Sequence, residues 1–126
     1  MRAAMLVLGL VVAGCGDDEG EEGAPKTAYE RDLAPKLASC TGCHDPERAE
    51  AGLDLTNVRA LFDQPSGQHD MPLITPGNHR QSYLWHKVAG TQGIAGGLGT
   101  RMPVGARWTD EDIDLLARWI DLGAPE

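Results

Sequence analysis

The chain is poor in aromatic residues and in positive charge. Its 126 residues include one Phe, two Tyr and three Trp, and 11 Lys and Arg stand against 19 Asp and Glu, a net charge of −8. This acidic balance excludes the basic surface that nucleic-acid binding requires. With so few aromatic residues and 16 Gly, the core is thin, and we expect a large flat cofactor to fill part of it.

A hydrophobic run long enough to span a bilayer is also missing from the N-terminal part. Met1 and Arg2 give a short positive start, and the apolar run 5–12 that follows is too short for a membrane helix. The pattern predicts a signal peptide over residues 1–14. The segment 12–15, Val-Ala-Gly-Cys, resembles the bacterial lipobox, which implies that Cys15 is lipidated and holds the mature protein on a membrane.

Cysteine is scarce too, and its odd number is informative. One lipidated Cys15 leaves two of the three cysteines, so no thiol is left over if these two serve one site. Directly after Cys15, five acidic residues are mixed with glycines. The negative charges of such a segment repel one another, and it has no apolar surface to bury. It predicts a solvated tether over residues 15–26, followed by one domain over 27–126. We expect an extracytoplasmic protein, lipid-anchored to a bacterial membrane on its periplasmic face or at the outer membrane.

The two remaining cysteines lie in the run Cys40-Thr41-Gly42-Cys43-His44. This is the C-x-x-C-H signature of covalent haem attachment. At this spacing each thiol can form a thioether to one vinyl group, and the next imidazole can coordinate the iron from the proximal side. The motif predicts one covalent haem c bound by Cys40, Cys43 and His44.

Other interpretations of this motif are a thioredoxin-like dithiol, half of a zinc site, or a disulfide. A redox dithiol is expected near a βαβ pattern, which the chain does not show. A structural zinc site needs four ligands, and a second Cys pair does not exist in the sequence. The export signal adds weight to the haem interpretation.

The domain favours helices and lacks convincing strand alternation. Thr27 and Glu30 form a capping box for a helix that runs into Cys40, with Pro35 starting a second turn or kinking it. We expect Thr56 to cap a short helix through residue 62, and another helix over 81–88. Thr109 caps the clearest element, whose inward positions are Ile113, Leu116, Ala117 and Ile120, widened by Leu115 and Trp119, and which stops at Gly123 and Pro125.

A six-coordinate iron needs a second axial ligand. Met102 is our choice, because it follows a glycine-dense stretch and precedes Pro103. A thioether favours Fe(II) and raises the reduction potential relative to two imidazoles. Met71, which also precedes a proline, is the first alternative. Three histidines could instead supply a second imidazole: His69, His79 and His86.

These motifs together resemble the planctomycete-type cytochrome c domains of exported bacterial proteins. The likeness covers about residues 27–125. It consists of C-x-x-C-H, a glycine-leucine segment at 51–55, a Pro-Gly segment at 76–84, the Met102-Pro103 pair, and a closing helix that ends in Trp119, Ile120, Gly123 and Ala124. Val104 departs from the family pattern, in which a second proline is common. The resemblance implies an all-α, cytochrome c-like helical domain around haem c, with His44 and Met102 as axial ligands.

The expected function is electron transfer with redox partner proteins, without substrate at the metal. Two strong axial ligands keep small molecules from the iron, so that electrons pass through the haem edge. A peroxidase-like enzyme is an alternative, which would need an open distal site with an acid or base such as His69 or Asp70. A redox or gas sensor with a labile distal methionine is another.

Overall fold

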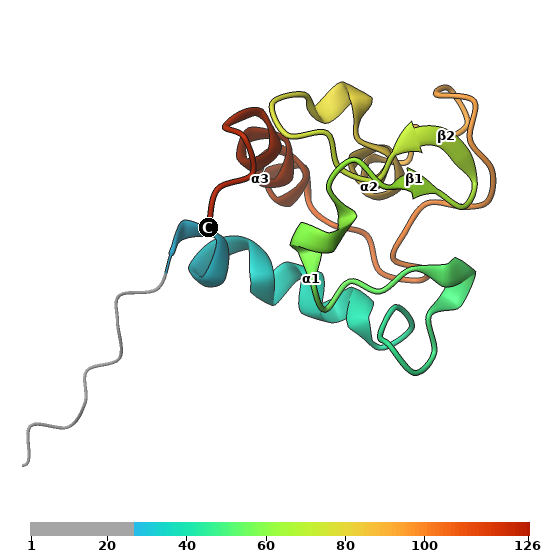
Figure 1. The fold of residues 1–126 in the computed structure, drawn as a ribbon, viewed down its shortest axis with the longest axis horizontal. Coiled ribbons are helices and arrows are strands. Elements are labelled where there is room, and N and C mark those ends of the chain that lie inside the picture. The colour runs from blue at the N-terminus through green and yellow to red at the C-terminus, as the bar shows by residue number, and fades with distance from the viewer. Residues whose placement is uncertain (1–26) are drawn as a thin grey trace, which may run out of the picture.

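The computed structural model describes residues 27–126. The helices at the N-terminal end of this part form one layer, and the other helices and strands form a second layer that faces it (Figure 1). The predicted signal peptide, the lipidated Cys15 and the acidic tether lie outside the described residues. The helices are η1 (Tyr29–Leu33), α1 (Ala34–Thr41), η2 (Glu50–Gly52), η3 (Val58–Leu61), η4 (His79–Gln81), α2 (Tyr83–Ala89) and α3 (Asp110–Asp121). Within this part of the chain, none of the helices has the length and apolar character needed to cross a bilayer.

The first helical segment begins with the predicted capping box. The Thr27 N–H donates to Glu30 Oε2 at 3.0 Å, and the Glu30 N–H donates to Thr27 Oγ1 at 3.1 Å. The segment then changes type at Pro35, as the sequence predicts. A π-helical turn, η1, precedes α1, and the Ala34 N–H reaches back five residues to Tyr29 O. Proline lacks an N–H and crowds the carbonyl four residues earlier, and a widened turn relieves both problems.

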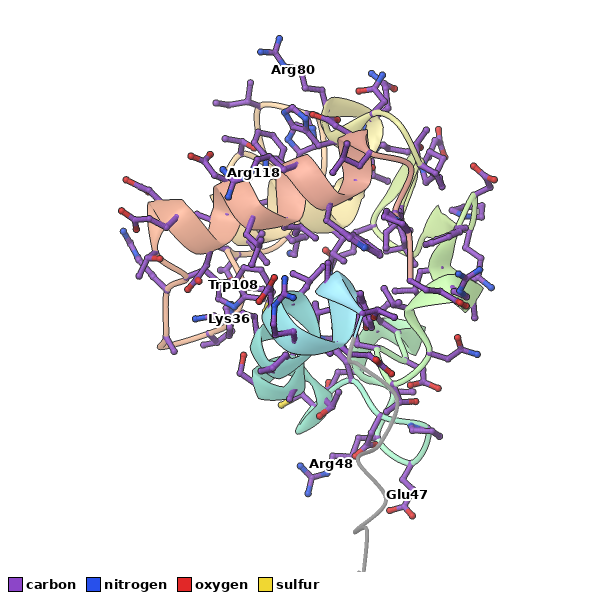
Figure 2. All side chains as sticks on the ribbon, turned by 90° about the vertical axis from the view of Figure 1, so that its left-hand side faces the viewer. Lys36, Glu47, Arg48, Arg80, Trp108 and Arg118 are labelled. Atoms are coloured by element: carbon purple, nitrogen blue, oxygen red, sulfur yellow. The ribbon has the colours of Figure 1, made fainter. Side chains whose placement is uncertain are left out.

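The core lies between this first segment and α3. Leu33 and Leu37 are 1% and 2% exposed, and the Trp119 ring packs on Tyr29 with a centroid distance of 5.3 Å. Lys36 Nζ pairs with Asp112 Oδ1 at 2.9 Å and links the two layers at the surface (Figure 2). Trp119 is buried, and its Nε1–H donates to Pro125 O at 2.7 Å. Its role is therefore structural, as the inward stripe on this helix predicts.

One expectation for the middle of the chain is wrong, and the all-α prediction is confirmed only in part. Thr56 does not cap a helix: it bonds to Asp54, and the short 3₁₀ helix η3 starts after Asn57 without a side-chain cap. The domain is also not purely helical, because β1 (Pro65–Ser66) and β2 (His69–Pro72) pair as an antiparallel hairpin. Strands this short show too little alternation to be seen in the sequence.

The helix α2 is fixed on its N-terminal side by polar contacts. Asn78 Oδ1 accepts from the Gln81 N–H at the start of η4. The His79 N–H and Nδ1 bind the two oxygens of Asp121 at 2.9 and 2.7 Å, which ties η4 to the end of α3. These contacts lower the pKa of the Asp121 carboxyl. On α2, Leu84 and Val88 face the core, as predicted for the helix expected at 81–88.

The predicted boundaries of α3 are confirmed. Thr109 Oγ1 accepts from the Asp112 N–H at 3.2 Å, and Gly123 ends the helix with φ of 93°. The Ala124 N–H then returns to Trp119 O at 2.9 Å. Because α3 supplies four buried residues to the core, its N-cap contributes to the stability of the whole domain.

Thr109→Ala removes this cap, and we expect it to lower the free energy of unfolding by about 1 kcal/mol. The matched control is Thr56→Ala, which removes a threonine hydroxyl that caps no helix. Urea unfolding followed by circular dichroism measures both. An equal loss in the two variants would contradict the assigned roles.

Candidate haem site

The C-x-x-C-H motif lies on the last turn of α1 and the turn that follows it. The N–H groups of Cys43 and His44 both donate to Cys40 O, at 3.2 and 3.1 Å. This continuation of the helix keeps the two thiols and the imidazole on one short, defined backbone segment. The structure therefore brings together Cys40, Cys43 and His44, which the sequence assigns to one site.

The His44 ring is held by a backbone carbonyl. Its Nδ1 lies 3.0 Å from Glu50 O. A carbonyl oxygen only accepts hydrogen bonds, so Nδ1 carries the proton and Nε2 presents its lone pair. An imidazole whose other nitrogen donates to a carbonyl is the usual form of a metal-bound histidine.

Glu50 is a positioning residue that sequence reasoning missed. Its N–H donates to Cys43 O at 3.1 Å while its carbonyl accepts from His44, so it binds two consecutive residues of the motif. The Leu55 N–H also donates to His44 O at 2.8 Å. The contacts use only the backbone of Glu50, and the identity of its side chain gives no signal of them.

The loop that presents Glu50 has an unusual backbone. Ala49 and Ala51 have φ values of 40° and 56°, in the left-handed region that non-glycine residues seldom adopt. Asp45 stabilises the loop through its Oδ1, which accepts from the N–H groups of Glu47 and Arg48 at 3.0 and 2.6 Å. A strained backbone of this kind persists only where surrounding contacts stabilise it. Here the strained loop positions the Glu50 carbonyl, which orients the His44 ring.

The two thiols differ in exposure and are not joined to each other. Cys40 is buried, whereas Cys43 is exposed. Burial raises the pKa of the Cys40 thiol, and the Ser39 hydroxyl 3.8 Å from its sulfur opposes this in part. A buried thiol close to an exposed one fits a flat group that is inserted into the domain and keeps one edge at the surface. The residues present therefore fit a haem, which Cys40 and Cys43 would hold through thioethers and for which His44 would be a ligand.

Met102 lies on another part of the fold, next to α2. Its N–H donates to Lys87 O at 2.9 Å, and its side chain is half-buried. The neighbouring Arg101 donates from Nε to Val88 O at 2.8 Å. In Figure 1 the orange segment that contains Met102 runs from the level of α2 down toward the level of α1. Two hydrogen bonds, one from the Met102 N–H and one from the Arg101 side chain, thus tie this segment to α2.

The alternative ligands lie on other elements and differ in availability. Met71 is half-buried on β2. His86 uses both ring nitrogens, with Nδ1 2.7 Å from Thr91 Oγ1 and Nε2 2.9 Å from Arg80 O. His79 is bound to Asp121 through Nδ1. The ring of His86 is therefore the least able to turn toward a metal.

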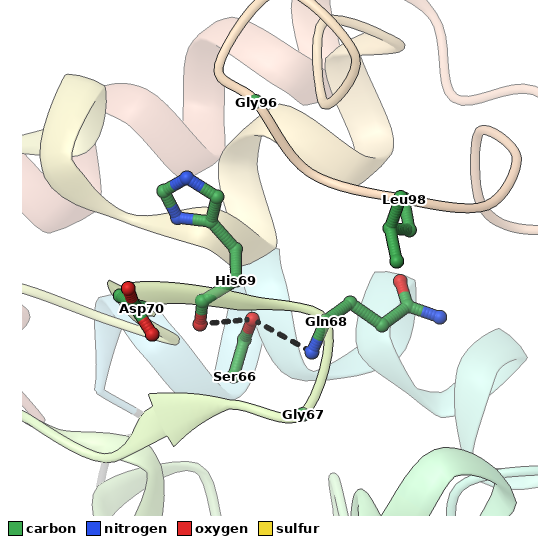
Figure 3. A pocket seen from close by; sticks show the side chains of 7 residues that line it. All are labelled: Ser66, Gly67, Gln68, His69, Asp70, Gly96 and Leu98. Carbon is green, nitrogen blue, oxygen red and sulfur yellow. Dashed lines mark hydrogen bonds between the residues drawn. The ribbon is translucent and has the colours of Figure 1, made fainter.

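His69 and Asp70 line a pocket of about 520 Å³ between the hairpin and the glycine-rich segment (Figure 3). His69 Nδ1 accepts from the Met71 N–H at 2.8 Å, and the ring is stacked on Tyr83 with a centroid distance of 5.8 Å. Among residues 27–126, no group of three or more His, Cys, Asp or Glu side chains is arranged to hold a metal ion. A haem needs no such group, because the porphyrin supplies four of the iron ligands.

The family comparison matches the part of the chain that contains the motif. A family model described as planctomycete cytochrome C matches residues 40–93, from the first cysteine of the motif to the glycine-rich segment. Met102 and α3 lie beyond the matched range. Comparison with curated proteins gave no match, and comparison with solved structures gave none. The description of the matched family model is that of a cytochrome, a class of haem-binding proteins that carry electrons. Residues 40–93, less than half of the chain, are thus similar to the planctomycete cytochrome C family, in agreement with the family that the motifs resemble.

Proposed function

We propose that the protein is a monohaem c-type cytochrome that carries electrons outside the cytoplasm and is tethered to a bacterial membrane by a lipid on Cys15. In this proposal Cys40 and Cys43 hold the haem through thioethers, and His44 and Met102 are the axial ligands. The bound haem supplies an iron that alternates between Fe(II) and Fe(III).

The hydrogen bond between His44 Nδ1 and Glu50 O is the observation that carries the proposal. It fixes the ring, assigns the proton to Nδ1 and leaves Nε2 as a ligand. A histidine that merely followed a structural disulfide would have no need for such a contact.

Electron transfer follows from coordination at both faces. His44 on one side and a thioether on the other would leave no open position, so that neither substrate nor gas binds the iron. The chain's own contribution is then to hold the ligands still. Glu50 does this for His44, and the Lys87 carbonyl does it for the Met102 backbone.

The full chain, exported by a host with c-type cytochrome maturation, should gain the mass of one haem. The haem should stay on the polypeptide in a denaturing gel, because thioethers survive unfolding. The double variant Cys40→Ser/Cys43→Ser should run without haem stain. Wild-type protein that is exported but colourless, with no added mass, would falsify the proposal.

Met102→Leu should remove the sulfur-to-iron charge-transfer band of the oxidised protein completely and lower its midpoint potential. Leucine keeps the volume of the side chain but has no donor atom. Met71→Leu is the matched control and should leave both the band and the potential unchanged. The reverse pattern would assign the distal position to Met71.

The same spectra separate the carrier from the two alternatives. An enzyme or a sensor would show high-spin iron, or rapid binding of CO or cyanide by the wild-type protein. A low-spin spectrum with slow ligand binding supports the carrier.

Cys15→Ser should move the protein from the membrane to the soluble fraction while its haem content stays the same. The reason is that the lipid is the only proposed anchor, and serine cannot be lipidated by the same chemistry. Fractionation of cells that express wild type and variant measures this. Full retention of the variant on membranes would contradict the anchor.

A further inference from the structure

Lys87 is a buried cation. It is 8% exposed on α2, and the other buried polar residues of the described chain, Ser82 and Gln92, are uncharged. Its Nζ donates to Gln68 Oε1 at 3.1 Å and to Leu98 O at 3.3 Å. Within residues 27–126, none of the ion pairs includes Lys87. Removing an ammonium from water without a counter-charge costs several kcal/mol, so such a group calls for an anion.

The Tyr83 hydroxyl lies one helical turn before Lys87 and competes for the same two acceptors. It is 3.4 Å from Gln68 Oε1 and 3.2 Å from Leu98 O. The ammonium has three hydrogens and the hydroxyl has one, and they face two neutral oxygens. We name Gln68, Tyr83, Lys87 and the Leu98 carbonyl the Lys87 cluster. It carries one positive charge and its acceptors are all neutral, so a carboxylate or a similar anion would complete it.

The backbone of the glycine-rich segment is shaped around this cluster. A Cβ at Gly97 would lie 2.3 Å from the Tyr83 hydroxyl oxygen, and a Cβ at Gly99 would lie 3.2 Å from Lys87 Nζ. Any side chain at 97 would therefore displace Tyr83. The same segment continues to Met102, whose N–H donates to Lys87 O. The cluster and the candidate distal ligand thus belong to one connected unit.

The stretch of sequence around Lys87 offers no carboxylate for this position. Residues 71–109 contain no Asp or Glu, although the whole chain has 19. Asp70 lines the same pocket as Gln68 and Leu98, but Figure 3 shows it at the opposite end, pointing away from them. Among residues 27–126, no carboxylate is paired with Lys87, so an anion at this position would come from outside that part of the chain.

We propose that Lys87, assisted by Tyr83, is the counter-ion of a haem propionate. The inference rests on the proposed function, because the proposed haem carries two carboxylates. If Met102 is the distal ligand, the haem would lie beside the segment whose Met102 N–H donates to Lys87 O, so a propionate would reach the cluster without a further association step. A free inorganic anion would lose translational entropy when it binds the Lys87 cluster, and a covalently held propionate would not.

The expected effect on the iron follows from charge. An ammonium beside a propionate offsets its negative charge, which otherwise favours Fe(III). Lys87→Met should therefore lower the midpoint potential, and it should shift the propionate bending band in resonance Raman spectra. Lys87→Arg keeps the charge and should preserve the potential close to that of wild type. Tyr83→Phe should move the Raman band with a smaller change in potential.

Arg80→Met is the matched control. Arg80 is exposed, and Figure 2 shows it extending from the surface, so this variant loses the same charge without touching the cluster. All variants are compared as exported, haem-loaded protein at one ionic strength. If Lys87→Met does not accumulate, Lys87→Gln and Tyr83→Phe test the same contact.

The outcomes separate this inference from the proposed function. Absence of covalent haem defeats both. Intact haem with the methionine–iron band, but the same potential and Raman band in Lys87→Met as in Arg80→Met, overturns the counter-ion alone. Loss of the low-spin spectrum in Lys87→Met would make Lys87 an iron ligand instead. A wild-type potential that depends on added inorganic phosphate, a dependence lost in Lys87→Met, would assign the cluster to a free anion.

Discussion

The hydrogen bond from His44 Nδ1 to Glu50 O is the constraint on which the site depends. An imidazole on a flexible turn can present either nitrogen, and only the ring with its proton on Nδ1 offers Nε2 to a metal. The loop that supplies the carbonyl adopts left-handed conformations at Ala49 and Ala51. The same residue binds Cys43 through its N–H, so the orientation of the ligand and the position of the second thiol are set together.

The features that sequence reasoning predicted well are those in which side-chain type determines the local structure. Three such features are the capping box at Thr27, the turn at Pro35 and the N-cap at Thr109. Each depends on a hydroxyl, a carboxylate or a missing N–H, which the residue type alone shows. The stripe of α3 is visible for the same reason, since burial repeats with the helical period. The C-x-x-C-H motif is visible in the sequence for the same reason, and its assignment to haem attachment stays a prediction.

What the sequence could not predict depends on backbone groups and on contacts distant in the chain. Glu50 acts through its carbonyl, which every residue has. Thr56 looks like a cap, yet the nearby Asp54 accepts its N–H and hydroxyl and gives it another local structure. The hairpin is too short to alternate, and the burial of Lys87 depends on Gln68 and on Leu98 O, which reach it from 19 and 11 residues away.

The composition and the site explain one another through charge. A chain with 19 acidic residues has none in 71–109, the stretch that contains α2 and Met102. A carboxylate there would pair with Lys87 and leave no charge for a cofactor. Its absence leaves the Lys87 ammonium with neutral acceptors only, which costs the polypeptide stability. In the proposed function, a haem propionate would offset that cost. The cofactor would then complete the domain in charge as well as in volume, which agrees with a core poor in aromatic residues.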